Sequence, residues 1–453
     1  MTSTLLAHGV GGRSDLPIPF SLAVGAAVLA VVVSFVALVA LWRTPRIRGA
    51  HAGRPLALWL AKTLDGAVFR WALRIIGLLG TTLVAIAAWG GPDDALNPTA
   101  GTVYVLFWVG CLAVASIVFG PVWRLLNPLR TIHLIICGAL GRDPRHSLVR
   151  TSAGYPDRLG YWPGALWLLA FVWLELVAPN RATTATLRSW FTAYALITLV
   201  GAVALGSRWF SRADGFEVYS TLLGRLSIIG RRDDARLVVR SPLAGIDALP
   251  LRAGAAAVVI VLIGSTAYDG LTSWAPFIAW VQSRNLSSQV SGTIGLGVCI
   301  AVVAVVYVAA CWLAGVLGHD RDDSSLPPIR PRDMPKVFAA SMIPIAAGYA
   351  LAHYYSLLVI VGQQTIGLLS DPLGTGANWF GTAEWGVNYG PVSPTLTASL
   401  QVLFVVVGHV VAVFAAHERA VTIFPRRTAI LAQLPLLAAM VGFTIAALLL
   451  LMS

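Results

Sequence analysis

Long runs of apolar residues alternate with short polar stretches along the whole chain. Each run is about 20 residues long, the length at which an α-helix crosses the hydrocarbon core of a bilayer. The pattern predicts an all-α fold, a polytopic transmembrane helix bundle in which residues 1–453 form a single integral membrane domain. The ten predicted spans cover residues 18–42, 70–90, 101–120, 161–178, 189–206, 253–268, 291–315, 337–361, 398–416 and 429–451.

The polar segments between the runs predict two large connections and several interfacial helices. Residues 207–252 form an Arg-rich loop that we expect in the cytoplasm, with a short hairpin around residues 230–234. Residues 362–397 form an aromatic loop that we expect on the extracytoplasmic side. The segment after Asn127-Pro128 begins like a helix, with an N-cap and a first-turn proline, but is too short to span. We therefore expect it to be interfacial or re-entrant.

The charge distribution predicts the orientation of the bundle. The chain is 57% hydrophobic and 11% charged, with a net charge of +12. Its basic residues gather in alternate connections, and only Arg13, Arg181, Arg188 and Arg284 lie in the other set. The positive-inside rule then predicts a multi-pass protein with both termini extracytoplasmic. The Arg-rich, Lys-poor composition indicates a bacterium of high GC content, so we expect the plasma membrane, with the lipid bilayer and no nucleic acid as partner.

Two arginines follow the third span. Arg124 and Arg130 would lie at the level of the lipid phosphates, where basic side chains anchor a helix. A contact with a phosphorylated ligand is the alternative interpretation.

Ionisable residues inside the spans are the main chemical clue, because they are costly in lipid and often functional. At 1.5 Å per residue, Glu175 lies about 21 Å from the cytoplasmic start of its span, and Asp269 and His353 about 24 Å. At this common depth they could hold a divalent metal (Zn, Mn or Fe) or relay protons. Gln363 follows at the outer end. The competing interpretation is that Glu175 and Asp269 only mark helix ends at the interface.

His409 is the second histidine within a span. It lies roughly 12 Å deeper than His353, which disfavours a haem held between them, because its axial ligands must lie nearly level. His409 remains a candidate member of the buried polar site. His417 lies eight residues further, near the same helix face, so a proton path through both is a second interpretation.

Aromatic residues dominate the extracytoplasmic loop. Trp379, Phe380, Trp385 and Tyr389 could cover the polar site as a lid, or they could settle at the lipid headgroups as interfacial aromatics do.

Polar groups outside the spans carry weaker signals. His8 and Asp15 could join a metal site on the extracytoplasmic side, and the cluster at residues 319–323 (HDRDD) resembles a metal loop only loosely. A solvated arm and a solvated turn are the simpler interpretations.

Four stretches carry a resemblance to a known group: HGVGGRSDLPIP, GPVWRLLNPLRT, FGTAEWGVNYGPVSP and QVLFVVVGHVVAVFAAHERA. On these, the whole chain resembles a group of poorly characterised polytopic membrane proteins of actinobacteria, some of which are labelled as fenitrothion-hydrolase-like. The resemblance implies a membrane-bound, metal-assisted phosphotriester hydrolase. It supplies no catalytic residues.

Three functions follow as hypotheses. The first is transport of a small solute or ion through the buried histidine and acidic residues. The second is a membrane-embedded, metal-dependent hydrolase of the organophosphate type. The third is an assembly subunit without chemistry of its own, whose buried polar groups serve helix packing. The sequence has neither an alignable inverted repeat nor a GxxxxGK[ST] motif, so the preference for transport rests on the membrane class.

Overall fold

The computed structural model of the protein describes residues 12–47, 49–149, 154–284, 286–318 and 330–452. His8 and the cluster at residues 319–323 lie outside the described residues, so nothing is added to their interpretation.

Each predicted span coincides with a helix, which confirms the all-α bundle. The helices are α1 (Phe20–Leu41), α3 (Ala67–Gly90), α4 (Thr99–Gly101) with the π-helical η3 (Thr102–Ala115) and α5 (Ser116–Phe119), α8 (Trp162–Leu176), α9 (Thr184–Leu205), α13 (Ala255–Leu271), α15 (Ser288–Gly318), α17 (Ile343–Leu368), α18 (Pro394–Ile423) and α19 (Ala429–Leu451). Shorter helices join them: η1 (Arg13–Asp15), η2 (Gly49–His51), α2 (Leu58–Asp65), α6 (Trp123–Leu126), α7 (Pro128–Ala139), η4 (Asp157–Leu159), α10 (Arg208–Arg212), α11 (Gly215–Leu223), η5 (Gly224–Leu226), α12 (Pro242–Asp247), α14 (Ala275–Ser283), η6 (Pro331–Asp333), α16 (Met334–Phe338) and η7 (Ala339–Met342).

Most of the ten predicted spans have the length and apolar composition of a full crossing. Within the described residues, 8 helices are long and apolar enough to cross a membrane, or 9 when α13 and α14, which meet at 81°, count as one span. The remaining predicted span is α8, which has 15 residues and is therefore about 22 Å long, short of a 30 Å hydrocarbon core. Hydrophobicity alone could not predict that α8 is this short, because the length of a helix depends on the residues at which the flanking turns begin.

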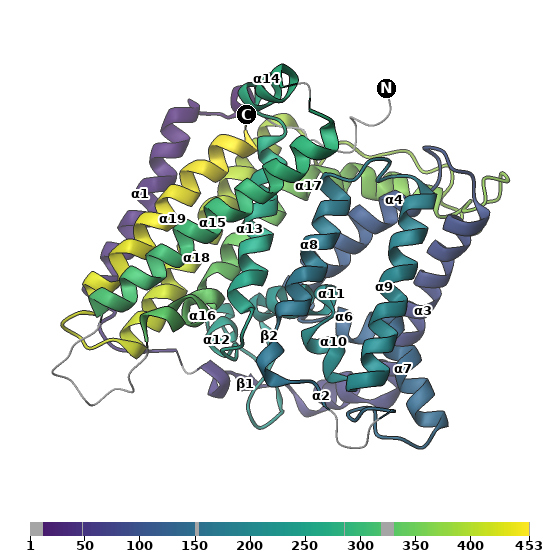
Figure 1. Ribbon diagram of the computed structural model, residues 1–453, viewed down its shortest axis with the longest axis horizontal. Helices are drawn as coiled ribbons and strands as arrows, with labels where there is room; N and C mark the ends of the chain where they lie inside the picture. Colours follow the sequence, from purple (N-terminus) through teal and green to yellow (C-terminus); the bar gives the residue numbers. More distant parts are fainter. Residues whose placement is uncertain (1–11, 48, 150–153, 285, 319–329, 453) are drawn as a thin grey trace.

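The bundle has two distinct ends (Figure 1). At one end, Arg13 donates from Nε to the carbonyl oxygen of Met452 at 3.0 Å, so both ends of the described chain meet there, beside α14. We call this the terminal end. At the opposite, sheet end lie three short antiparallel strands in the order β1 (Arg54–Pro55), β3 (Leu237–Val239) and β2 (Ile229–Arg231).

The sheet end confirms the predicted hairpin. Strands β2 and β3 pair antiparallel, with Gly230 opposite Val238. In the connecting turn, Arg232 hydrogen-bonds to Asp234 and lowers the pKa of that carboxyl to about 2. Arg231 pairs with Asp65 at the end of α2, which ties the hairpin to the surface helix.

The remainder of the segment 207–252 is more deeply inserted than the predicted loop. Helix α11 lies among α8, α6 and η3 inside the bundle, and most of its residues are buried. Asp214 caps its start by accepting a hydrogen bond from the Phe216 amide at 3.0 Å. Tyr219 stacks on Trp108 of η3 with ring centroids 4.4 Å apart. This segment therefore contributes side chains to the interior of the bundle.

Glycines bring α17 and α18 into close contact. A Cβ on Gly408 would lie 2.6 Å from the carbonyl oxygen of Pro344, and one on Gly348 would lie 3.1 Å from the Cα of Gly408. Small residues at such crossings let transmembrane helix backbones approach and pack without a hydrophobic driving force. This crossing fixes the position of the polar residues that α17 carries further along.

Candidate functional site

Three helices bring the predicted acidic and histidine residues together. His353 of α17 pairs with Asp269 of α13, with His353 Nε2 at 2.7 Å from Asp269 Oδ2. Each side chain is only 10% exposed. Glu175, near the end of α8, is connected to the pair through the hydroxyl of Tyr354. The sequence placed these three residues at a common depth, and the structure shows which of them are in contact.

Tyr354 is the residue that connects the two carboxylates. Its hydroxyl oxygen lies 3.3 Å from Glu175 Oε1 and 3.4 Å from Asp269 Oδ2. The imidazole of His353 lies edge-on to the Tyr354 ring, with centroids 4.8 Å apart. Tyr349, one turn earlier on α17, stacks on the His353 ring with centroids 5.8 Å apart. The aromatic rings hold the imidazole in place against Asp269.

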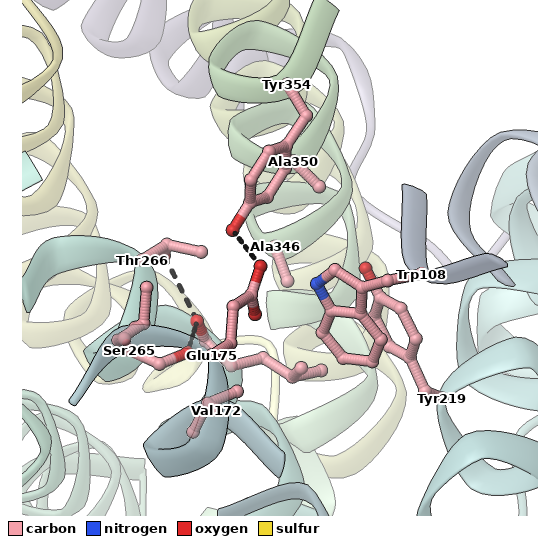
Figure 2. Close-up of a pocket in the computed structure, with 11 residues that line it drawn as sticks. Trp108, Val172, Glu175, Tyr219, Ser265, Thr266, Ala346, Ala350 and Tyr354 are labelled. Atoms are coloured by element: carbon pink, nitrogen blue, oxygen red, sulfur yellow. Dashed lines mark hydrogen bonds between the residues drawn. The ribbon is translucent and has the colours of Figure 1, made fainter. Parts of the chain in front are cut away.

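A small pocket borders this chain of polar groups (Figure 2). It has a volume of about 20 Å³, enough for a single water molecule. Figure 2 shows Tyr354 and Glu175 pointing toward each other, with the rings of Trp108 and Tyr219 on the other side of the carboxylate. The lining comes from η3, α8, α11, α13 and α17: Trp108, Val172, Glu175, Leu176, Tyr219, Leu262, Ser265, Thr266, Ala346, Ala350 and Tyr354.

The arrangement is a linear hydrogen-bonded chain. Among the described residues, no group of three or more His, Cys, Asp or Glu side chains is arranged to hold a metal ion. Glu175 reaches Asp269 through the Tyr354 hydroxyl, whereas ligands of one ion would converge on a common point. The hypothesis of a divalent metal at Glu175, Asp269 and His353 thus gains no support from their positions. A chain of this kind can bind and relay protons.

Gln363 lies outside this site and has a different task. Its side-chain amide accepts from the backbone N–H of Asn388 at 3.0 Å and donates to the Asn388 carbonyl oxygen at 3.1 Å. This reciprocal pair fastens the connection 369–393 to the end of α17. The Thr382 hydroxyl adds a second link by donating to the Ile366 carbonyl oxygen of α17 at 2.9 Å.

The aromatic residues of that connection do not cover the pocket. Trp385 is 67% exposed, and Trp379, Phe380 and Tyr389 are also exposed. None of them lines the pocket. The interpretation as interfacial aromatics therefore fits the structure better than the lid.

The histidines of α18 have separate surroundings. His409 is buried, with Nδ1 at 2.8 Å from the Val405 carbonyl oxygen, and its Nε2 has no hydrogen-bond partner among the described residues. His417 contacts the carbonyl oxygen of Trp42 and the side chain of Gln433, each at 2.8 Å. His417 thus ties α18 to the end of α1 and to α19, which accounts for its position without a proton path.

Arg130 is not at the lipid surface. It is buried and donates from Nε and Nη2 to both carboxylate oxygens of Glu217, at 2.9 and 2.6 Å. Arg124 is exposed, so the proposed lipid or phosphate contact remains open for that residue alone. The predicted start of the following helix is confirmed, because Asn127 caps α7 and accepts from the Arg130 amide at 3.1 Å.

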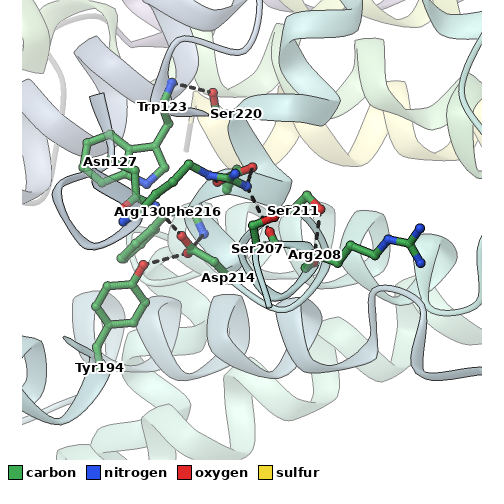
Figure 3. Close-up of polar contacts among 11 residues, drawn as sticks. Trp123, Asn127, Arg130, Tyr194, Ser207, Arg208, Ser211, Asp214, Phe216 and Ser220 are labelled. Carbon is green, nitrogen blue, oxygen red and sulfur yellow. Dashed lines mark hydrogen bonds and ion pairs between the residues drawn. The ribbon is translucent and has the colours of Figure 1, made fainter. Parts of the chain in front are cut away.

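The cap residues of two helices meet in the same network (Figure 3). Asn127 of α7 donates from Nδ2 to Asp214 of α11 at 2.8 Å, and Tyr194 donates its hydroxyl to the same carboxylate at 2.7 Å. All of these side chains are buried. The network fixes α11, whose Tyr219 lines the pocket.

No protein-family model matches the sequence, and neither a curated protein nor a solved structure matches it.

Sequence reasoning missed Tyr354 and the contribution of α11. Tyr354 directly follows His353 inside an apolar span, and such a hydroxyl needs a partner when it is buried. That was a usable signal. Tyr219 and Trp108 gave none, because the insertion of α11 depends on a tertiary network that joins segments 87 positions apart.

Proposed function

We propose that the protein is a membrane transporter that carries protons through Glu175, Tyr354, Asp269 and His353. The observation that carries this proposal is the position of the Tyr354 hydroxyl between two carboxylates, at 3.3 and 3.4 Å, with His353 at 2.7 Å on the far side of Asp269. Titratable groups linked in this way inside apolar helices are typical of proton relays.

The single proton of the Tyr354 hydroxyl determines which neighbour donates and which accepts. The Tyr354 hydroxyl has one proton and two carboxylate neighbours, so it donates to one of them and accepts from the other. The group is electrically neutral when His353 is protonated, Asp269 is ionised and Glu175 carries a proton, and neutrality is favoured in a low-dielectric interior. Glu175 then donates to Tyr354, and Tyr354 donates to Asp269.

This arrangement defines one transfer step. Glu175 gives its proton to the Tyr354 oxygen while the Tyr354 proton passes to Asp269, and the hydroxyl is restored with its dipole reversed. The pocket beside Glu175 has room for one water, which supports a proton as the transported ion over an organic solute. The predicted orientation would place His353 toward the extracytoplasmic side.

The experiment is proton flux in sealed proteoliposomes, measured with an internal pH-sensitive dye after an imposed pH step. Tyr354→Phe removes the bridging hydroxyl and keeps the ring, so we expect the flux to fall at least about tenfold, as for a lost general acid–base group.

The matched control is Tyr307→Phe on α15. It also removes a buried hydroxyl from a transmembrane helix, one that donates to the Pro335 carbonyl oxygen at 2.6 Å. We expect Tyr307→Phe to keep the wild-type flux. Equal flux in wild type and Tyr354→Phe would contradict the relay, and an assembly role would then be the better account.

A further inference from the structure

Three buried polar side chains on the neighbouring helices α17 and α18 lack partners. Ser356 Oγ, Thr397 Oγ1 and Gln401 Oε1 have no hydrogen-bond partner among the described residues. These residues are at most 3% exposed. Buried polar atoms are nearly always satisfied, by protein groups or by ordered water, because an unmade hydrogen bond costs free energy.

The two hydroxyls depart from the behaviour of their neighbours. A serine or threonine inside a helix usually donates to the carbonyl oxygen four residues earlier. Thr365 of α17 and Ser399 of α18 do so, each at 2.7 Å. Ser356 and Thr397 lie on the same two helices without this bond. Their hydroxyls are therefore available to a group between the helices.

Helix geometry places all three groups near one another. Gln401 and Thr397 come 7 and 11 residues before Gly408, which puts them within about 20° of the side of α18 that contacts α17. Ser356 lies about 12 Å beyond Gly348 along α17 and about 80° around the helix, between the side that contacts α18 and the side that carries His353. Gln401 lies about 10.5 Å before Gly408 along α18. Because the helices run antiparallel from the Gly348–Gly408 crossing, Ser356 and Gln401 lie at the same level, with Thr397 one turn nearer the terminal end.

This group adjoins the candidate site. Ser356 follows His353 by three residues on α17, so the two side chains are neighbours on the helix surface, with Ser356 about 4.5 Å nearer the terminal end. The polar atoms thus form a continuation from His353 through Ser356 and Gln401 to Thr397, which is in the first turn of α18.

We propose that a file of internal water molecules lies between α17 and α18 at Ser356, Gln401 and Thr397, and connects His353 to the terminal end of the protein. A water placed there finds the two to four polar partners that internal waters require. The role of this route as a proton path rests on the proposed function, whereas its existence does not.

The test is the accessibility of introduced thiols in the full-length protein. In a background where Cys111, Cys137, Cys299 and Cys311 are alanine, Ser356→Cys and Thr397→Cys are made separately and reconstituted in liposomes. Silver ions are added, and the unmodified thiol that remains is quantified by mass spectrometry over time. The control is Ala352→Cys, one turn before Ser356 and 1% exposed, in an apolar cluster with Ala27, Val405 and Leu448.

We expect Ser356→Cys and Thr397→Cys to react at least about tenfold faster than Ala352→Cys, since thiol reactivity follows access to water. Equal rates at all three positions would overturn the proposal. Sodium ions that protect Ser356→Cys, where choline does not, would also overturn it, because the interface would then be a cation site.

Proton flux separates this proposal from the proposed function. If the introduced thiols react but the protein carries no protons, the water route stands and the proposed transport function is rejected. If the introduced thiols do not react but the protein carries protons, only the water route is rejected.

Discussion

At the scale of single residues, Glu418 shows how this protein satisfies a charge buried at the end of a span. Its carboxylate accepts hydrogen bonds from the Trp42 indole at 2.7 Å and from the backbone amides of Arg46 and Ile47 at 2.8 and 2.7 Å. Glu418 is 2% exposed. It fastens the chain after α1 to α18.

Glu418→Gln should destabilise the protein by about 2 kcal/mol, because hydrogen bonds to a charged acceptor are lost and an amide N–H₂ is turned toward a donor. The measurement is the free energy of unfolding in mixed micelles titrated with SDS. Glu384→Gln, an exposed glutamate in the connection 369–393, is the control and should change nothing. A Glu418→Gln protein as stable as the control would contradict this account.

At the scale of elements, α7 and α11 are joined at their first turns. Asn127 and Asp214 are the cap residues and hydrogen-bond to each other (Figure 3). Arg130 and Glu217, each three residues further, form a bidentate pair. The first turn of α7 was predictable from Asn127-Pro128, but its partner was not, because the match between the two helices exists only in the folded chain.

Arg130→Met should cost about 3–5 kcal/mol, since it leaves the Glu217 charge buried and unpaired. The double variant Arg130→Met with Glu217→Met removes both charges and should recover most of this loss. SDS titrations of the three proteins give the comparison. If the double variant is no more stable than the single one, Arg130 does not neutralise Glu217 in the way described.

The glycine contact between α17 and α18 is the second element-scale feature. Gly408→Ala places a methyl group 2.6 Å from the Pro344 carbonyl oxygen, so the helices must separate. We expect a loss of about 1–3 kcal/mol, the usual cost of overpacking. Gly442→Ala on α19 meets nothing within 4 Å and should be neutral. Equal stability of these two variants would show that the crossing is looser than the structure has it.

At the scale of the whole molecule, the apolar runs predicted the bundle and the ten helical segments, because the length of an apolar run is a local property of the sequence. Depth along each helix also placed Asp269 and His353 at one level, but their contact could be seen only in the structure. Sequence could not predict that Arg130 turns inward to Glu217, nor that Gln363 holds a loop instead of joining the site. Those positions depend on contacts between segments distant in sequence, which no local pattern encodes.

The central claim is that Glu175 and Asp269 exchange a proton through Tyr354, and proton flux into proteoliposomes tests it most directly. The account predicts that the wild-type protein dissipates an imposed pH gradient faster than empty liposomes. It further predicts that Glu175→Gln and Asp269→Asn each lower that rate at least about tenfold, while Glu384→Gln does not. A wild-type rate equal to that of empty liposomes, or rates unchanged in both variants, would contradict the account.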